Sequence, residues 1–467
     1  MKMREFGGFS MNQRTLDMTQ GKPISLITAF ALPLMLGNVF QQFYTVVDTA
    51  VVGKALGVGV LAAMGSTDWL GWMMVSFIQG LTQGFGILMA QAFGARDEKG
   101  LRKTVGASVV LAAIAAVVLL IAGQLAAVPV LRLLRTPEEI LHYGVQYLRY
   151  IFAGVPISMA YNLLACTLRS LGDGKTPLHA MIVASCVNVA LDLLFVLVFR
   201  WGIPGAAIAT LIAQACSVVF CLMRIRRLPV LKLQKSDFRL SGLLAWRLLR
   251  LGFPVALQNA IISVGGMIVQ TVVNGFGVAF IAGFTATNKL YGVLEIAATS
   301  YGYAMTTYAG QNLGAGKLSR IRQGQRAASW VCLAISAVIA AIMVGFGRRI
   351  VGMFISGTPE ETAAAIDVAY RYLTIMAVCL PSLYLLYVFR STIQGMGNTV
   401  LPMVSGVAEF VMRICAALLL PLAVGEMGLY YAEVLAWIGA DFILIPSYFI
   451  VLRQRERQFA DGKRIDT

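Results

Sequence analysis

The sequence predicts an all-α membrane protein of twelve transmembrane helices, arranged in two six-helix lobes that are related by an internal parallel repeat. Three observations predict this fold class. Hydrophobic residues make up 58% of the chain and charged residues only 13%, whereas soluble domains average about 25% charged residues. The apolar residues form twelve long, continuous stretches. Finally, the second half of the chain repeats motifs of the first half at a nearly constant offset.

Each apolar stretch is long enough to cross a membrane as a helix, because about 30 Å of hydrocarbon takes roughly 20 helical residues. In the first half, the predicted spans are 24–52, 60–92, 104–127, 149–168, 178–199 and 204–223. In the second half, they are 253–273, 279–309, 327–346, 372–389, 401–422 and 429–452. Twelve spans is therefore the simplest count.

The repeat is carried by short motifs that recur 220 to 223 residues apart. The recurring pairs are QAFGA at 91–95 with QNLGA at 311–315, TPEE at 136–139 and 358–361, and GDGKT at 172–176 with GMGNT at 395–399. Because each lobe has an even number of spans, both lobes share one orientation and are related by an axis along the membrane normal. Many secondary transporters build two states around one site from such repeats.

The apolar stretches and the charges together predict the domain boundaries. The predicted parts are a cytoplasmic N-terminal segment at 1–23, an N-lobe at 24–223, a basic cytoplasmic linker at 224–250, a C-lobe at 251–452 and a cytoplasmic tail at 453–467. The first twenty residues contain no apolar core, so we expect no cleavable signal peptide.

Positive charge predicts the orientation. With a cytoplasmic N-terminus, the cytoplasmic segments carry 28 of the 38 Lys and Arg residues, Arg390 among them, and two more, Lys289 and Arg413, fall inside spans. The outer loops hold eight: Lys54, Arg132, Arg135, Arg149, Arg200, Arg348, Arg349 and Arg371. This excess is the positive-inside signature of a multi-pass protein of the plasma (inner) membrane. The net charge of +16 is thus mostly topology, and we expect the lipid bilayer, not nucleic acid, as its partner.

The chain lacks the residue patterns of enzymes and metal sites. None of the seven cysteines forms a CxxC pair, and all lie in or beside apolar runs, which favours small core residues. GDGKT at 172–176 resembles a fragment of a phosphate loop, but it sits between two spans, so we interpret it as a cytoplasmic turn. We predict no enzymatic activity, no cofactor and no metal beyond a coupling cation.

The most informative residues are acids inside the apolar stretches, because an ionisable group in hydrocarbon is costly and usually faces a cavity or a partner. Asp48 lies in the first predicted span. Tyr44 and Gln41 precede it by four and seven residues, so the three side chains share one helix face. Pro33 lies fifteen residues before Asp48 and favours a bend, because proline removes one backbone hydrogen bond.

A second acid lies in the span 178–199. Asn188 precedes Asp192 by four residues on the same face, and Thr210 follows in the next span behind a short turn, at a similar depth. With Asp48, these residues offer carboxylate, amide and hydroxyl oxygens, a set suited to a proton or to Na⁺. The alternative is a group of unrelated polar residues in helix packing. In the second copy of the repeat, Cys415 occupies the position equivalent to Asp192. The second lobe therefore lacks this carboxylate, and the ion chemistry is confined to the first lobe.

Other intramembrane charges have more than one interpretation. Glu409 and Arg413 are spaced i, i+4 and form either a structural ion pair or a cavity contact. Asp441 has no evident partner. A further group consists of possible substrate or lobe-interface contacts: Asp68, its repeat equivalent Asn288, the neighbouring Lys289, and Glu295, which is close enough along the chain to balance Lys289.

The VVDT segment at 46–49, GDGKTP leading into VNVALD at 187–192, and the second-lobe QNLGA and GMGNT motifs resemble the multidrug and toxic compound extrusion (MATE) transporters. The resemblance covers roughly 20–455. It implies a cation-coupled antiporter that exports bulky, amphiphilic and often cationic compounds. We expect the two lobes to open alternately to the two sides of the membrane, and we expect the functional unit to be a monomer. The family does not reveal the substrate.

The resemblance is strongest to the branch of the family with a first-lobe cation site. It implies that Asp48, Asn188, Asp192 and Thr210 form the cation or proton site. It also implies supporting roles in the first-lobe cavity for Gln41, Tyr44, Asn162 and Pro33, the last as the point where the first span bends. The branch with a second-lobe site carries an acid in the span 253–273, and this chain has none there.

The sequence also bears on three functions other than antiport. A flippase for lipid-linked precursors shares the wider architecture, but it would need cavity cations, and only Lys289 and Arg413 lie inside predicted spans. An ion channel would not need a duplicated lobe with acids in one copy. A membrane enzyme would need a cluster of catalytic residues at a membrane face, which the sequence does not contain.

Overall fold

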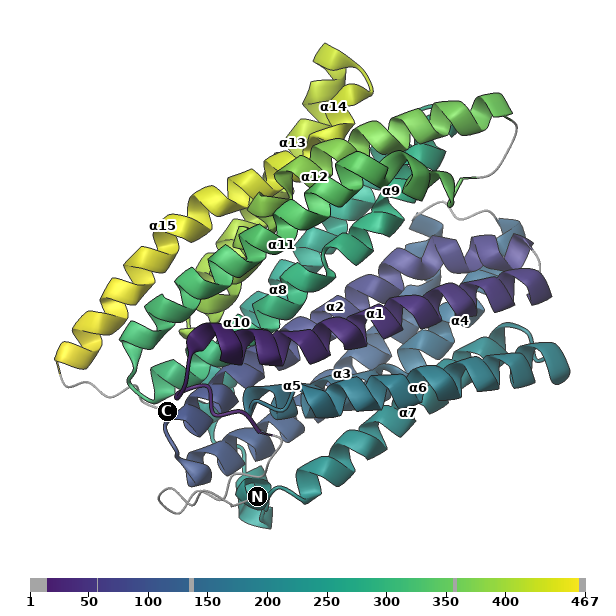
Figure 1. Cartoon of the computed structure of the whole chain (residues 1–467). Helices are drawn as coiled ribbons and strands as arrows, with labels where there is room; N and C mark the ends of the chain where they lie inside the picture. Colours follow the sequence, from purple (N-terminus) through teal and green to yellow (C-terminus); the bar gives the residue numbers. More distant parts are fainter. Residues whose placement is uncertain (1–14, 57, 134–137, 356–358, 462–467) are drawn as a thin grey trace. The chain divides into compact units, whose positions relative to one another are not determined.

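The computed structural model describes residues 15–56, 58–133, 138–355 and 359–461 (Figure 1). Within these ranges, only the backbone is described for residues 44, 46–56, 58–66, 68, 69, 138–140, 278 and 359. The described chain is helical and contains no β-strand, which confirms the predicted all-α class.

Helices of the first half follow the predicted apolar stretches and extend beyond most of them. They are α1 (Pro23–Leu56), α2 (Val58–Gly94), α3 (Glu98–Leu133), α4 (Glu138–Ala153), α5 (Val155–Ser170), α6 (Lys175–Asp192), the π-helical η1 (Leu193–Val198) and α7 (Ile203–Arg226). The basic linker holds two short 3₁₀ helices, η2 (Pro229–Leu231) and η3 (Lys235–Phe238), and leads into α8.

The second half has the same order of long helices. They are α8 (Gly242–Val273), α9 (Val278–Leu294), α10 (Ile296–Gly314), α11 (Leu318–Gly352), α12 (Pro359–Gly395), α13 (Val400–Val424), α14 (Met427–Tyr430) and α15 (Ala432–Ala460).

The number of spans differs from the predicted twelve. In the described chain, ten helical segments are long and apolar enough to cross a membrane, or eleven if α4 and α5, bent by 44°, count as one span. The stretch predicted at 279–309 is not among them. It divides into α9 and α10 at Glu295, and α9 has only 17 residues. The longer α10 carries buried polar side chains, including Thr306, Gln311 and Asn312, which lower its apolar character.

The chain forms two compact units whose boundaries fall inside helices. The first unit holds 15–18 and Leu32–Ala256, and the second holds Thr19–Ala31 and the chain from Leu257 onward. Both α1 and α8 therefore begin in one unit and end in the other. The crossings lie within three residues of Pro33 and Pro254, which are related by the repeat.

The GDGKT segment forms the turn between α5 and α6, as its position between two spans predicts. Gly172 adopts φ +80°, which favours glycine. The Asp173 carboxylate accepts hydrogen bonds from the backbone nitrogen and the hydroxyl of Thr176, at 2.9 and 2.7 Å. Arg224 of α7 lies 3.2 Å from the same carboxylate. The aspartate therefore closes the turn and ties it to α7.

Close backbone contact joins α2 to the start of α8 within the first unit. A Cβ atom added to Gly84 would lie 2.2 Å from the Cα of Gly252, and one added to Gly80 would lie 2.6 Å from the Cα of Ala256. The two small residues on each helix are four apart. This spacing lets membrane helices approach closely, with van der Waals contact as the main attraction.

We expect Gly84→Ala to lower the melting temperature of the detergent-solubilised protein, because the added methyl group meets backbone that cannot rotate away. Overpacking typically costs about 1–3 kcal/mol. Gly345→Ala is the matched control, since nothing lies within 4 Å of a Cβ at that helical position. Size-exclusion chromatography after heating measures both variants. Equal melting temperatures would contradict the close contact.

Candidate functional site

The helices α6 and α7 run side by side as a hairpin in the first unit (Figure 1). The turn between them is closed by aromatic stacking of Phe195 on Trp201, with ring centroids 4.8 Å apart. The Trp201 backbone nitrogen donates a 2.9 Å hydrogen bond to the Phe195 carbonyl. Gly202 has φ +67°, and Pro204 stands in the first turn of α7, where its missing N–H costs no helical bond. This turn determines the register of the two helices.

The hairpin brings two of the predicted site residues into contact. The Asn188 side-chain nitrogen donates to the Thr210 hydroxyl at 3.4 Å, and that hydroxyl donates to the Ala206 carbonyl at 3.1 Å. Asn188 is only 2% exposed. Its side-chain oxygen accepts no hydrogen bond from the described part of the chain. The amide oxygen is therefore a buried acceptor with capacity for a ligand.

Asp192 lies one turn beyond Asn188 on α6 and is fully buried, with 0% exposure. It is the last α-helical residue before the π-helical η1, in which the Phe199 nitrogen bonds to the Leu194 carbonyl, five residues back. Such π-helical segments are frequent at functional sites because they change the register of the side chains that follow. Sequence spacing alone did not reveal this segment.

Among the supporting residues predicted for the cavity, Asn162 is buried on α5 and donates to the Ser158 carbonyl of its own helix at 2.9 Å. No hydrogen bond in the described chain joins it to Asn188 or Thr210. Gln41 is exposed on α1, and its backbone carbonyl accepts from the Thr45 hydroxyl at 2.9 Å.

Four predicted positions lie on α1 and α2. Pro33 stands inside the continuous helix α1, so the helix contains the proline without a break in this structure. The side chains of Tyr44, Asp48 and Asp68 fall outside the described part of the structure, which places only their backbone, on α1 and α2. The proximity of Asp48 to Asp192 remains a prediction.

The predicted substrate or interface contacts in the second unit do not form one cluster. Lys289 is exposed on α9, Asn288 beside it is half-buried, and Glu295 stands at the break between α9 and α10. No ion pair joins Lys289 to Glu295 within the described residues, so the predicted charge balance is wrong. Instead, the Tyr387 hydroxyl of α12 donates to the Glu295 carboxylate at 3.5 Å.

A buried chain of four charges crosses the second unit. Arg390 lies 2.6 Å from Glu409, which lies 3.0 Å from Arg413, which in turn lies 2.9 Å from Glu433. The Glu409–Arg413 pair predicted from i, i+4 spacing is thus the middle of a longer network that joins α12, α13 and α15. Arg390, which the predicted spans place just beyond the stretch 372–389, lies within α12, and its side chain is buried against Glu409.

The acid without an evident partner in the sequence has one in the structure. Asp441 on α15 is buried and accepts a 2.6 Å hydrogen bond from the Ser382 hydroxyl on α12. Its second oxygen has no hydrogen-bond partner among the described residues. A partner 59 residues away in the chain leaves no local sequence signal.

Comparisons with known proteins agree on one family. The MatE family model matches residues 33–194 and 254–419, and these segments begin at the two repeat-related prolines. Probable multidrug resistance protein YoeA of Bacillus subtilis is 30% identical over 390 residues, which cover 81% of this chain and 82% of that protein. Probable multidrug resistance protein YpnP of the same organism is 30% identical over 421 residues, covering 89% and 92%.

A solved structure shows the same fold. The outward-facing conformation of a multidrug resistance MATE family transporter of the MOP superfamily has a TM-score of 0.88 to this chain. The match covers 96% of this chain and all of that chain, at 21% sequence identity. At this identity the likeness concerns the fold alone.

Proposed function

We propose, because this chain belongs to the MATE family of multidrug transporters, that it exports amphiphilic, often cationic small molecules in exchange for H⁺ or Na⁺. Members of the family are membrane transporters and not enzymes. This proposal has four parts: the antiport mechanism, the coupling ion, the cytoplasmic location of both termini and a monomeric functional unit.

The observation that carries the coupling proposal is the fully buried Asp192 beside the Asn188–Thr210 contact. A carboxylate in a low-dielectric interior is stabilised either by a proton or by a cation. The buried amide oxygen of Asn188 and the hydroxyl of Thr210 are neutral oxygens of the kind that Na⁺ accepts as ligands. Together with the predicted Asp48, they offer one site for either cation.

The proposed cycle couples this site to alternating access. A cation that enters from outside neutralises Asp192 and Asp48, which removes the cost of their charges and changes their hydrogen bonds. The first span then bends at Pro33, the first-lobe cavity shrinks, and the exported molecule leaves outward. Coupling requires that the cation and the exported molecule each prefer a different state of one equilibrium.

Flux measurements in proteoliposomes test the proposed function. We expect efflux of a fluorescent cationic dye when a Na⁺ gradient or a proton gradient is imposed alone, and none when both gradients are absent. Dye flux that ignores both gradients would contradict antiport. Dye-independent ion conductance in planar bilayers would indicate a channel instead.

The flippase alternative needs buried cations that are free to hold a pyrophosphate. Arg413, one of two cations predicted inside spans, is held between Glu409 and Glu433. Arg390 is also held by Glu409. This arrangement favours antiport, because the buried arginines Arg390 and Arg413 already have carboxylate partners, and Lys289, the other cation predicted inside a span, is exposed rather than buried.

Replacing Thr210 should distinguish Na⁺-driven efflux from proton-driven efflux. We expect Thr210→Val to raise the Na⁺ concentration for half-maximal efflux about tenfold, the lower end of the effect for a residue that orients a metal ligand. Proton-driven efflux should change little, since protonation of Asp192 does not need the hydroxyl. Thr210→Ser keeps the hydroxyl and is the control. Equal losses for both cations in the valine variant would show that Thr210 is not a Na⁺-specific residue.

A further inference from the structure

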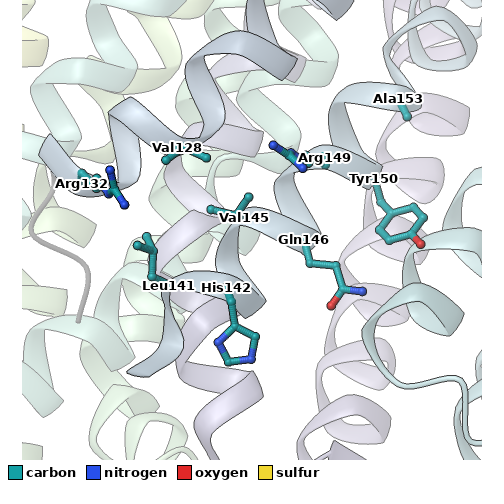
Figure 2. Close-up of a pocket in the computed structure, with 9 residues that line it drawn as sticks. All are labelled: Val128, Arg132, Leu141, His142, Val145, Gln146, Arg149, Tyr150 and Ala153. Carbon is teal, nitrogen blue, oxygen red and sulfur yellow. The ribbon is translucent and has the colours of Figure 1, made fainter. Parts of the chain in front are cut away.

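A pocket of about 610 Å³ lies between α3 and α4 in the first unit, and none of the predicted coupling residues is among the residues that line it (Figure 2). Its polar lining consists of Arg132 from α3 and of His142, Gln146, Arg149 and Tyr150 from α4. The α4 residues recur at intervals of three and four, so one face of the helix forms the wall. Nothing in the proposed antiport mechanism uses this pocket.

The pocket is positively charged without an internal counter-charge in the described structure. None of its lining residues is acidic. No carboxylate of the described chain lies within 4.0 Å of the guanidinium group of Arg132 or Arg149, and both residues are exposed at the surface. Two guanidinium groups without a carboxylate partner among the described residues present planar hydrogen-bond donors that fit a phosphate group.

The internal repeat shows that the second lobe fills the equivalent position differently. At the offset of 222 residues that relates the two TPEE motifs, Arg149 corresponds to Arg371 and Val145 corresponds to Asp367. Asp367 forms an ion pair with Arg348. The second lobe therefore supplies a carboxylate from its own chain, whereas the first lobe has a valine there. Figure 2 shows Val145 between Arg132 and Arg149 in this view.

The surface beside the pocket is apolar. Arg132 stands at the end of α3, which is long and apolar enough to span the membrane. Large side chains on the same helix are exposed, with Ile121 at 54%, Leu125 at 74% and Leu133 at 81%. In a transmembrane helix such residues contact acyl chains. The pocket thus combines cationic donors at the membrane surface with an adjoining lipid-facing helix.

We propose that this pocket binds the phosphate group of an anionic phospholipid, with the head group held by Arg132 and Arg149 and the acyl chains along α3. Basic pockets between transmembrane helices on the cytoplasmic side bind phosphate head groups. The same donor chemistry is present here on the outer side, where the predicted topology places Arg132 and Arg149. The inference is independent of the transport mechanism, and its test measures binding rather than efflux.

Native mass spectrometry of the purified full-length protein, titrated with phosphatidylglycerol, tests the proposal. We expect the double variant Arg132→Gln/Arg149→Gln to weaken phosphatidylglycerol binding at least about tenfold, because it removes the charge-assisted hydrogen bonds to the phosphate. The double variant Arg349→Gln/Arg371→Gln is matched in charge and should bind as the wild type does. Equal weakening in both would mean general attraction to a basic protein and would overturn the site.

A single substitution tests the electrostatic argument. Val145→Asp gives the first lobe the carboxylate that the second lobe has, so it should abolish the preference for phosphatidylglycerol over phosphatidylcholine. The asparagine of Val145→Asn has nearly the same shape as that aspartate but carries no charge, so this variant should keep the preference for phosphatidylglycerol. If Val145→Asp binds phosphatidylglycerol as the wild type does, the proposal fails.

Competition with inorganic phosphate tests whether the pocket binds a lipid or a free anion. We expect millimolar phosphate to compete weakly with phosphatidylglycerol, since it lacks the acyl chains. Phosphate that displaces the lipid completely, or that raises the melting temperature as much as the lipid does, would assign the pocket to a free anion and overturn the lipid assignment. Wild-type lipid binding by Arg132→Gln/Arg149→Gln would also overturn it.

Discussion

Asp192→Asn is expected to reduce gradient-driven efflux to the level of protein-free liposomes while the protein remains folded and inserted. Asparagine keeps the shape of the side chain, but it can neither carry a charge nor take up a proton at physiological pH. Asp192 is fully buried in the first unit, so its charge is costly unless a proton or a cation neutralises it. Dye efflux under separately imposed Na⁺ and proton gradients measures the loss.

The control for this variant removes a carboxylate elsewhere. Asp367→Asn acts on an acid at the surface of the second unit, whose partner Arg348 is also exposed, and it should retain wild-type efflux. Both proteins should elute at the same volume from a size-exclusion column. Wild-type efflux by Asp192→Asn at equal expression would remove this residue from the coupling site.

The second large effect concerns the buried charges of the second unit. Glu409→Gln should destabilise the protein by about 3–5 kcal/mol, the usual cost of breaking a buried ion pair from one side. Two arginines lose a carboxylate contact in this variant, because Glu409 contacts both Arg390 and Arg413. We expect a sharp drop in the yield of monodisperse protein. Glu456→Gln, which removes one partner of an exposed pair with Arg322, should leave the yield unchanged.

Exchanging the two residues of the central pair should not restore stability. An isolated pair would tolerate Glu409→Arg/Arg413→Glu. In this network, however, the exchange places an arginine beside Arg390 and a glutamate beside Glu433, so two attractive contacts become repulsive. The double variant should therefore be no more stable than Glu409→Gln. Recovery of wild-type yield would show that Arg390 and Glu433 contribute little.

The parts of this structure that could be predicted from sequence are those with local or periodic signals. Continuous apolar runs and the repeated TPEE and GDGKT motifs predict the class and the two copies. The Asn188–Thr210 contact follows from helix periodicity and a short turn. These inferences need only neighbours along the chain or across one hairpin.

The parts that could not be predicted depend on distant packing or on subtle changes in helix geometry. Arg390 and Glu433 join the ion pair from other helices, so no spacing rule links them to Glu409. The π-helical turn after Asp192 and the division between α9 and α10 at Glu295 both lie inside stretches that are continuously apolar in the sequence. Apolar periodicity continues through both places and conceals them.

In the proposed mechanism one first-lobe site takes either H⁺ or Na⁺, so the two cations should compete for it. Efflux from proteoliposomes is measured over a range of Na⁺ gradients at several external pH values, for the wild type and for Asp48→Asn/Asp192→Asn. We predict that lower external pH weakens the effect of Na⁺ in the wild type, and that the double variant loses both dependences together. Additive effects of H⁺ and Na⁺ that survive in the double variant would contradict the claim.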